Sequence, residues 1–500
     1  MADMFSNLSL GLAVVLSLKT LGLCFLGCLI GTLIGVLPGI GPVATIAMLL
    51  PVTFGLDPTG ALIMLAGIYY GAQYGGSTTA IIVNIPGEVT SVITVLDGHQ
   101  MAQQGRAGVA LGTAAIGSFV AGTIATVIIA ALGAPLAQFA LRFGPADYFS
   151  LMVFGLMFAV VLARGSLLKA VAMIFVGILL STVGTDLETG QARLTFGRPE
   201  IYDGIEFAVI AMGVFGFAEI LRTVEQREIR NVEKTPIGRL LPDGKDLREA
   251  AWPILRGTFI GAFLGLLPGN GAVLGPFASY AAEKRLSKDP SRFGKGAIEG
   301  VAGPESANNA GAQTSFLPLL TLGIPPNAVM ALMVGAMTIH GIQPGPQIIS
   351  KQPGLFWGMV ASMWIGNLML LVINLPLVGL WIRLIRAPYR LLFPAIILFC
   401  CIGIYSINNS SAEVTMVAIF GFVGYLLMKL EFEPAPLILG FVLGKLLEEK
   451  FRQSLLISRG SLATFTEHSI SATLLALTAI LFVISLLPAI NKARNKVFVE

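Results

Sequence analysis

The sequence predicts an all-α polytopic membrane protein with about 10–12 spans, arranged as two inverted-topology repeats with broken or re-entrant helices. Three observations support this fold class. Hydrophobic residues make up 55% of the 500 residues, and the mean hydropathy is +0.82. Charged residues make up 12%, against roughly 25% in soluble domains. The string at 35–43 returns at 265–273, a shift of 230 positions (265 minus 35).

Long apolar runs mark the helices that cross the bilayer, because a helical span needs about 20 predominantly apolar residues. These runs are 109–139, 149–163, 167–182, 356–382, 391–407 and 470–487. The first apolar run of the chain lacks a basic n-region and is too long for the core of a signal peptide, so we expect it to be retained as a span.

Each copy of the duplicated string is a Leu-Pro-Gly-x-Gly segment that interrupts an apolar helix. A second pair of breaks follows, at 84–87 in the first half and at 323–326 in the second. Before these breaks, Gly-Ala-Gln at 71–73 matches Gly-Ala-Gln at 311–313, a shift of 240 (311 minus 71). The repeats predict a first transmembrane repeat at 9–221, a cytoplasmic connecting segment at 222–256, a second transmembrane repeat at 257–460, and a C-terminal span with a cytoplasmic tail at 461–500.

The distribution of Lys and Arg assigns the loops to the two sides of the membrane, because cytoplasmic loops are enriched in these residues. The basic segments predicted inside are 164–169, 222–256, 284–295, 383–390, 445–459 and the tail from 492 to 496. The mixed and partly acidic loop at 185–203 is predicted outside.

Equivalent loops of the two halves differ in charge. The loop after the first break is basic in the second half, at 284–295, but holds no Lys or Arg in the first half, at 54–59. For the next loops the preference reverses, since Arg106 is traced to the inside and 339–347 to the outside. The halves are therefore predicted to be inverted relative to each other, with the amino terminus outside.

The cysteines and histidines do not support a metal or catalytic centre. Cys24 and Cys28 stand one helical turn apart, Cys400 and Cys401 are neighbours, and no His completes a metal-type spacing. No pair of nucleophile and base stands out, and no G-x-x-x-x-G-K-[ST] loop is present, so we expect neither an enzyme nor direct use of ATP. The basic residues form short clusters between apolar runs, which argues against a nucleic-acid surface. No cofactor is expected.

Three of the four helix breaks lie in two windows, 20–105 and 296–350, that contain no Lys or Arg. A break at membrane depth persists only where protein or a wet cavity covers the freed backbone groups. Helix amino termini exposed there present free N–H groups and about half a positive charge, which suits a carboxylate. The candidate substrate-binding residues are Pro38, Gly39, Gly41, Ser77, Thr78, Thr79, Asn84, Pro268, Gly269, Asn270, Gly271, Asn308, Asn309, Thr314, Ser315, Pro325 and Asn327.

A structural alternative applies to the glycines upstream of the first breaks. Small residues at this spacing let transmembrane helices approach closely. We favour helix packing for these glycines and a binding site for the Pro-Gly-x-Gly and hydroxyl clusters. The upstream glycines are Gly27, Gly31, Gly35, Gly257, Gly261 and Gly265.

The stretch 303–311 is rich in polar side chains and holds one charged residue, Glu305. An acidic residue that enters a membrane segment is a functional hypothesis by default. Glu305 and the hydroxyl of Thr321 are therefore candidates to couple Na⁺ or H⁺ to transport. An equally weighted alternative is that Glu305 caps the following helix from a solvated loop. Asp97 is expected in a loop, and Asn374 is expected to join neighbouring helices.

Several motifs in one order carry a resemblance to a known family. They are the two Leu-Pro-Gly-x-Gly segments, Gly-Gly-Ser-Thr-Thr-Ala at 75–80 with Asn-Ile-Pro-Gly at 84–87, and Pro-Glu-Ser-Ala-Asn-Asn-Ala at 304–310 with Thr-Leu-Gly-Ile-Pro at 321–325. Over nearly the whole chain they resemble the large membrane subunit of the tripartite tricarboxylate transporter family. The resemblance implies ion-driven uptake of citrate-like or other carboxylates across the bacterial inner membrane, with a small membrane subunit and a periplasmic solute-binding protein.

The function expected from the sequence is secondary active transport of a small carboxylate, coupled to a cation, with alternating access between the two halves. One alternative is a passive anion channel, which sodium-dependent accumulation in proteoliposomes would exclude. The other is a non-transporting membrane scaffold, which uptake preserved after joint replacement of Ser77, Thr78 and Asn308 would favour.

Overall fold

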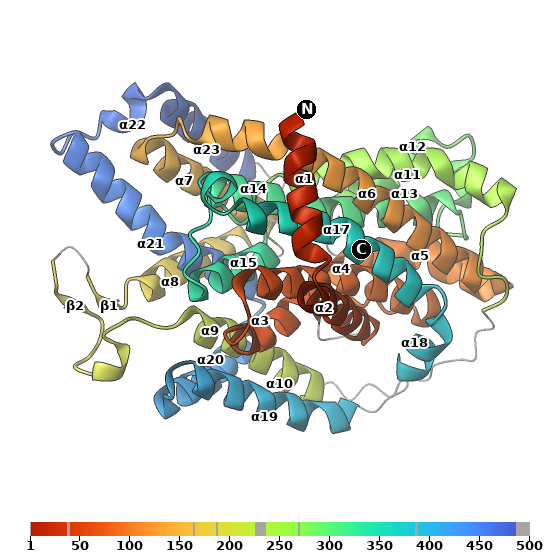
Figure 1. Cartoon of the computed structure of the whole chain (residues 1–500), viewed down its shortest axis with the longest axis horizontal. Helices are drawn as coiled ribbons and strands as arrows, with labels where there is room; N and C mark the ends of the chain where they lie inside the picture. The colour runs from red at the N-terminus through yellow and green to blue at the C-terminus, as the bar shows by residue number, and fades with distance from the viewer. Residues whose placement is uncertain are drawn as a thin grey trace.

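The computed structural model has the predicted all-α architecture (Figure 1). It describes residues 2–37, 41–163, 166–186, 189–225, 237–268, 271–385 and 389–486. Within these ranges the strands are confined to one antiparallel hairpin, in which β1 (Gly184–Thr185) pairs with β2 (Ala192–Arg193). Gly184 lies opposite Arg193 in this hairpin.

In the first half, the apolar runs at 109–139, 149–163 and 167–182 form helices, as predicted. The α-helices are α1 (Ala2–Val15), α2 (Leu18–Val36), α3 (Gly41–Thr53), α4 (Pro58–Val83), α5 (Val92–Met101), α6 (Ala107–Ala140), α7 (Pro145–Leu162), α8 (Leu167–Ser181), α9 (Phe207–Ala211) and α10 (Ala218–Glu225). Short 3₁₀ turns are η1 (Val89–Ser91) and η3 (Pro199–Ile201), and π-helical turns are η2 (Ala102–Arg106) and η4 (Met212–Phe217).

In the second half, one predicted span forms two helices. The α-helices are α11 (Gly244–Gly265), α12 (Gly271–Leu286), α13 (Glu299–Thr314), α14 (Phe316–Leu322), α15 (Ala328–Ile339), α16 (Ile348–Lys351), α17 (Pro353–Asn374), α18 (Val378–Ile385), α19 (Tyr389–Asn408), α20 (Ser411–Lys429), α21 (Pro434–Ile457), α22 (Thr464–Glu467) and α23 (Ser469–Leu486), with the 3₁₀ turn η5 (Pro290–Arg292). The run at 356–382 is interrupted between α17 and α18, because Pro376 removes a backbone donor and disfavours helix at the preceding residue.

Six helices within the described ranges are long and apolar enough to cross a membrane. Their bounds are Leu18–Val36, Val89–Ala140, Pro145–Leu162, Phe207–Glu225, Pro353–Asn374 and Ser411–Lys429. Further apolar helices are shorter, among them α3 and α15, because the breaks divide the apolar sequence. The prediction of 10–12 spans therefore exceeds the number of helices that satisfy the length requirement individually.

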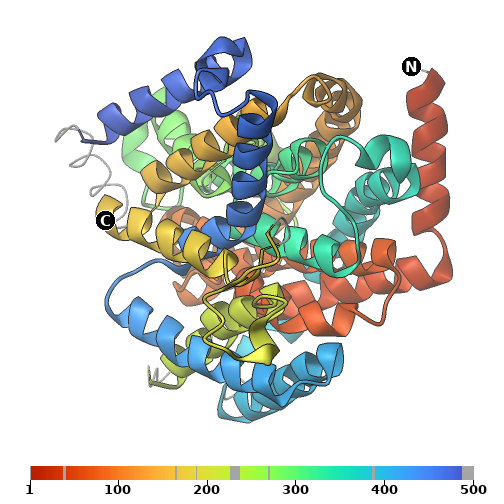
Figure 2. The same cartoon turned by 90° about the vertical axis from the view of Figure 1, so that its left-hand side faces the viewer.

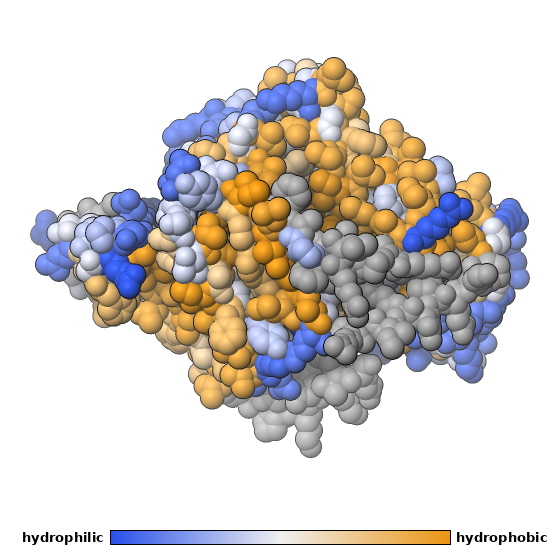
Figure 3. All heavy atoms as spheres, turned by 90° about the horizontal axis from the view of Figure 1, so that it is seen from below, coloured by the Kyte–Doolittle hydropathy of each residue, from blue (hydrophilic) through white to orange (hydrophobic). Residues whose placement is uncertain are grey.

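The molecular surface is consistent with a lipid environment. Large apolar side chains are widely exposed, including Phe175, Trp252, Phe259 and Phe263. Figure 3 shows one face dominated by hydrophobic residues, with hydrophilic residues gathered mainly toward its margins. Such extended apolar surface is uncommon on soluble monomers.

Two helix pairs, α2 with α4 and α11 with α13, pack on the upstream glycines of the two halves. A Cβ added at Gly31 would lie 2.3 Å from the carbonyl oxygen of Ile68, and one added at Gly261 would lie 2.1 Å from that of Ala307. No side chain fits at these distances, so the backbones themselves are in contact. The packing interpretation of these glycines is confirmed.

The same register recurs along both pairs. Gly27, Gly31 and Gly35 face Met64, Ile68 and Ala72, whereas Gly257, Gly261 and Gly265 face Gly303, Ala307 and Gly311. The partner helices are therefore related by 239 positions (311 minus 72). The sequence match of 71–73 with 311–313 was wrong by one residue, because the Gly-Ala-Gln identity does not follow the packing register.

Contacts between the halves connect opposite ends of the two repeats. Helix α3, after the first break of the first half, packs against α15, after the second break of the second half. Conversely, α12, after the first break of the second half, packs against η1 and α5, after the second break of the first half. This reciprocal arrangement is the one expected of inverted repeats.

One part of the loop assignment is wrong. The segments 445–459 and 185–203 were predicted on opposite sides of the membrane, yet they are joined by ion pairs. Arg193 lies 2.7 Å from Glu448, and Arg452 lies 3.1 Å from Asp186. The hairpin and α21 both face the viewer in Figure 2. Acidic partners neutralise the basic residues at this contact. A count of Lys and Arg therefore placed one of the two segments on the wrong side of the membrane.

Candidate functional site

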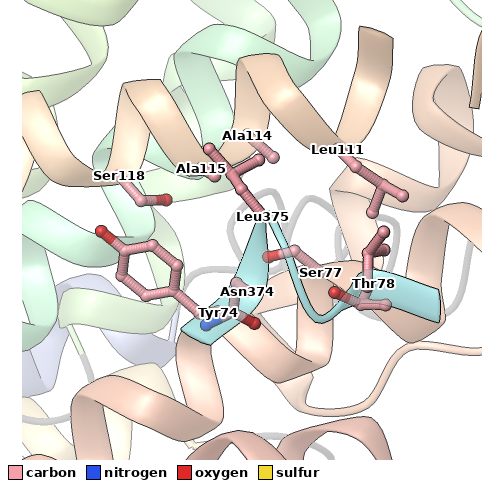
Figure 4. Close-up of a pocket in the computed structure, with 10 residues that line it drawn as sticks. Tyr74, Ser77, Thr78, Leu111, Ala114, Ala115, Ser118, Asn374 and Leu375 are labelled. Atoms are coloured by element: carbon pink, nitrogen blue, oxygen red, sulfur yellow. The ribbon is translucent and has the colours of Figure 1, made fainter. Parts of the chain in front are cut away.

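A pocket lined by aliphatic, hydroxyl and amide side chains lies between the two halves of the described chain. Its volume is about 310 Å³, including space open to solvent. The hydroxyl and amide groups that line it come from α4, α6 and the end of α17 (Figure 4). The lining residues are Tyr74, Ser77, Thr78, Leu111, Ala114, Ala115, Ser118, Asn374, Leu375 and Val378.

The pocket offers neutral hydrogen-bonding groups and no basic side chain. Ser77 and Thr78 face it from α4, and Asn374 faces it from the end of α17 (Figure 4). The hydroxyl of Tyr74 and the Oδ1 atom of Asn374 are buried and have no hydrogen-bond partner in the structure. Buried polar atoms normally have partners, so these atoms are candidates to contact a ligand.

Helix α13 forms the layer behind this pocket. Its side chain Glu305 is fully buried, with 0% exposure, and reaches Ser77 on the pocket wall. One turn later, Asn309 Nδ2 donates to Ser118 Oγ at 2.6 Å. Two of the lining residues are therefore held by side chains of the other half.

Glu305 receives its polar contacts from the first half of the chain. Ser77 Oγ lies 2.5 Å from Glu305 Oε2, and the hydroxyl of Thr94 contacts Glu305 Oε1. Among the described residues, no Lys, Arg or His forms an ion pair with Glu305. Glu305 lies inside α13 and is fully buried, so the alternative that it caps a helix from a solvated loop is wrong.

A second carboxyl group lies close to this one. Glu88 Oε1 accepts from the Thr90 hydroxyl at 2.5 Å and from Asn308 Nδ2 at 3.3 Å. Asn308 is 1% exposed, and its Oδ1 atom has no hydrogen-bond partner. Asn308 follows Glu305 by three positions on α13, so one face of this helix serves both carboxyl groups.

The second breaks have the same backbone in both halves. Asn84 and Gly323 both end their helices in the left-handed region, with φ of 62° and 74°. Glu88 and Asn327 then start the following helices with nearly the same extended backbone, at φ of −146° and −151°. These pairs are also 239 positions apart (323 minus 84), in agreement with the register of the glycine contacts.

The first breaks are described only in part. Pro38, Gly39, Gly269 and Asn270 lie outside the described residues. Pro268 is half-buried, and a Cβ added at Gly155 would lie 3.7 Å from the side chains of both Pro268 and Ile324. Gly41 begins α3 with a positive φ of 61°, whereas a Cβ at Gly271 would lie 2.0 Å from the carbonyl oxygen of Leu264. Among the first-break residues that the structure describes, none lines the pocket.

Other predicted site residues bond within or between helices. Thr79 donates to Val36 O at 3.0 Å, and Thr314 donates to Ala262 O at 2.9 Å, so both tie the paired helices together. The hydroxyls of Ser315 and Thr321 donate to carbonyl groups of preceding residues, at 2.6 Å each. Asn327 accepts from Met330 N at 2.9 Å as a helix cap, Pro325 is buried, and Asn84 is exposed.

Asp97 belongs to α5 and is fully buried, so its expected position in a loop was wrong. Its Oδ1 atom accepts from the backbone N–H groups of Gly294, Gly296 and Ala297 at 2.8–2.9 Å, and its Oδ2 atom accepts from Tyr280 at 2.9 Å. The carboxylate therefore holds the basic loop of the second half against α5. The turn-like Asp-Gly sequence concealed this long-range role.

Sequence reasoning missed Tyr74, Thr94 and Ser118 and assigned Asn374 only to helix packing. Asn374 does contact Thr32 Oγ1 at 3.4 Å, so it joins helices and lines the pocket. Tyr74 precedes Ser77 by nearly one helical turn, which was an available signal that they share a helix face. Ser118 and Thr94 carried no comparable signal, because their approach to α13 is a long-range contact.

The comparison with known proteins identifies the family of the chain. A model of the tripartite tricarboxylate transporter TctA family matches residues 21–439. The chain belongs to this TctA family. Family membership confirms the resemblance based on the motifs and identifies the chain as a multi-pass subunit of a tripartite transporter. TctA is a family of transporters rather than of enzymes.

Two relatives from Agrobacterium vitis are similar to this TctA-family chain. An uncharacterized 52.8 kDa protein in the TAR-I ttuC′ 3′ region is 57% identical over 500 residues and covers 100% of both chains. An uncharacterized protein in the TAR-II ttuC′ 3′ region is 58% identical over 240 residues, 48% of this chain and 99% of the relative. No solved structure matches the chain.

Proposed function

We propose that this chain is the substrate-translocating subunit of a cation-coupled secondary transporter that takes up citrate-like carboxylates across the bacterial inner membrane. A small membrane subunit and a periplasmic solute-binding protein would complete the assembly, and the latter would deliver the substrate. The observation that carries the proposal is a buried carboxyl group, Glu305, directly behind an uncharged pocket that has hydroxyl and amide groups in its wall, at the contact between the halves.

The pocket supports recognition of an anion without a basic residue. The windows 20–105 and 296–350 contain no Lys or Arg, and the lining groups from other segments are neutral as well. The hydroxyls of Tyr74 and Thr78 can donate to carboxylate oxygens. Substrate carboxylates would replace the missing partner of Tyr74.

Cation coupling follows from the charge of the cargo. Moving an anion into a cell with an inside-negative potential costs about 2.3 kcal/mol per charge per 100 mV. A cation bound at Glu305 would offset this cost while the substrate occupies the adjoining pocket. We propose Na⁺ or H⁺ for this role, with no organic cofactor and no resident metal.

The position of the pocket supports alternating access. Its walls include the beginning of α6, which is close to Arg106 and its 2.5 Å ion pair with Asp246. Arg106 and the connecting segment 222–256 were both predicted inside. The described conformation would therefore be the one that releases substrate to the cytoplasm, after the binding protein has loaded the opposite side.

The proposal can be tested by reconstituting the complete membrane complex in proteoliposomes with its binding protein. Uptake of radiolabelled citrate, malate and succinate is measured with and without imposed Na⁺ and pH gradients. Accumulation above the external concentration, driven by one of these gradients, is expected. Equilibration alone would indicate the channel alternative instead.

A variant set tests whether the pocket itself carries the substrate. Joint replacement Tyr74→Phe, Thr78→Val and Asn374→Leu is expected to lower uptake at least tenfold, because it removes two hydroxyl donors from the pocket and each hydrogen bond to a charged group contributes about 1.5–3 kcal/mol. The exposed Ser9→Ala serves as the control, because its hydroxyl bonds only to Ser6 O of its own helix among the described contacts. Unchanged uptake in the triple variant would favour the scaffold alternative.

A further inference from the structure

The hydrogen bonds around Glu305 can be counted, and the count indicates its protonation state. Thr94 Oγ1 contacts Oε1 of Glu305, and Ser77 Oγ lies 2.5 Å from Oε2. The same Ser77 oxygen lies 3.0 Å from the carbonyl oxygen of Gln73. Five oxygen atoms of acid, hydroxyls and backbone thus form a chain of three close contacts, and one hydrogen in each contact makes all three of them hydrogen bonds.

The two hydroxyl groups supply only two of these hydrogens. If Ser77 donates to the Gln73 carbonyl group, its contact with Glu305 Oε2 has no hydrogen unless the carboxyl group provides one. A neutral acid completes the series, since Thr94 donates to Glu305, Glu305 donates to Ser77, and Ser77 donates to Gln73. The backbone carbonyl of Gln73 has only acceptor capacity, so no reassignment of a side-chain amide changes this count.

The electrostatic surroundings favour the same state. The titratable groups facing Glu305 are Glu88 from the segment after α4 and Tyr74 from α4 itself. Toward the other end of α13, Asp97 is held by backbone N–H groups, and Glu283 of α12 is paired with Arg256 at 2.5 Å. No described cation remains to balance an ionised Glu305, and an unpaired buried charge costs several kcal/mol.

Asn308, three positions after Glu305 on α13, contacts a second and less buried acid. Its Nδ2 atom donates to Glu88 Oε1 at 3.3 Å, while its buried Oδ1 atom has no partner. Glu88 is only partly buried, whereas Glu305 is inaccessible to solvent. The pair therefore consists of a protected carboxyl group and a second one nearer to water, with an unsatisfied amide beside them.

We propose that the coupling ion is a proton, carried as the neutral acid by Glu305 and exchanged with solvent through Glu88. This inference rests on the proposed transport function and specifies its ion. On release, the O–H bond at Glu305 Oε2 breaks, an O–H bond forms on the carboxylate of Glu88, and that proton then passes to water. Ser77 turns its hydrogen from the Gln73 carbonyl to Oε2, and the Gln73 carbonyl keeps its helical bond.

Infrared spectroscopy tests the protonation state without any transport measurement. Purified full-length protein in lipid nanodiscs, in a potassium buffer near neutral pH, is expected to show a carbonyl band of a buried carboxylic acid. Glu305→Gln removes this band, whereas Glu413→Gln, which alters another buried glutamate on α20, retains it. Absence of a Glu305-dependent band, or its loss when NaCl is added at constant pH, would overturn the proposal.

Transport measurements then test the proton assignment separately from the proposed transport function. With citrate as the probe, an alkaline-inside pH gradient in sodium-free buffer is expected to drive accumulation at least tenfold above that without a gradient. Glu305→Gln is expected to lose this accumulation, because its amide cannot release a proton, whereas the control Glu413→Gln on α20 is expected to retain it. Accumulation that requires Na⁺ would overturn the proton assignment while the transport function stands. Absence of any carboxylate uptake would instead overturn the transport function.

Discussion

The two halves of the molecule share a helical framework but differ in the chemistry placed on it. The 239-residue register that relates α4 to α13 matches Glu305 to Ala66 and Glu88 to Asn327. Each half therefore contributes one carboxyl group, at positions that are not equivalent. The duplicated backbone determines where the helices end, whereas individual side chains determine which of these positions carries a carboxyl group.

The largest expected effect tests whether the framework is the same in both halves. Gly31→Ala and Gly261→Ala each place a Cβ 2.1–2.3 Å from a backbone carbonyl oxygen. Each is expected to destabilise the protein by about 1–3 kcal/mol or more, because overpacking displaces the partner helix. Thermal unfolding in detergent measures the effect.

Gly22→Ala provides the matched control on α2, since nothing lies within 4 Å of a Cβ at Gly22. This control is expected to be neutral or slightly stabilising, because alanine favours a helix by about 1 kcal/mol over glycine. A large loss of stability for only one of the two tested glycines would show that the helix pairs are not equivalent.

The next effect concerns the two left-handed residues that end α4 and α14. Gly323→Asn would bring a Cβ to 2.9 Å from the carbonyl oxygen of Pro344 and is expected to cost about 1–3 kcal/mol. The reverse change, Asn84→Gly, acts at an exposed residue and is expected to alter stability by less than about 1 kcal/mol. Equal effects in unfolding experiments would contradict the difference in packing at these two turns.

Substitutions at the equivalent positions Asn327 and Glu88 are expected to affect different properties, stability for Asn327 and transport for Glu88. Asn327 caps α15, so Asn327→Ala is expected to lower stability by about 1 kcal/mol. Glu88 contacts Thr90 and Asn308, so Glu88→Gln is expected to keep stability within that margin. Glu88 is the proposed proton acceptor, so Glu88→Gln is expected to lower the rate of pH-driven uptake by about 100-fold.

This pair of variants is assayed for both melting temperature and initial rate of uptake in proteoliposomes. The expected pattern is a lower melting temperature for Asn327→Ala and a lower rate for Glu88→Gln. The reverse pattern would mean that the acidic position is the structural one and the amide position the functional one.

The smallest effects are expected at the exposed ion pairs near the starts of α2 and α11. Lys19 lies 2.7 Å from Asp57, and Glu249 lies 3.4 Å from Arg292. Lys19→Ala and Glu249→Ala are each expected to change stability by at most about 1 kcal/mol, because exposed pairs are screened by water. A substantially larger loss in either half would reveal a further structural role of that pair.

The helical fold and the repeat were predictable because they depend on local patterns. The apolar runs anticipated α6, α7 and α8, and the duplicated breaks anticipated where the paired helices end. The assignment of 445–459 and 185–203 to opposite sides failed because the partners of the basic residues, including Asp186, lie far away in sequence. Charge counting does not detect neutralisation that only the fold creates.

The candidate site was predictable only in part. Ser77, Thr78 and Glu305 were found because polar residues are conspicuous in an apolar segment. Tyr74 and Ser118 reach the same place through packing between α4, α6 and α13, which no periodicity encodes. The first breaks, which were expected to hold the substrate, do not line the pocket where they are described.

A density map of the complete complex with the transported carboxylate bound tests the account most directly. The account predicts ligand density between α4, α6 and the end of α17, with carboxylate oxygens within hydrogen-bond distance of the hydroxyls of Tyr74 and Thr78. Density at another location, with this pocket filled by protein side chains, would contradict it.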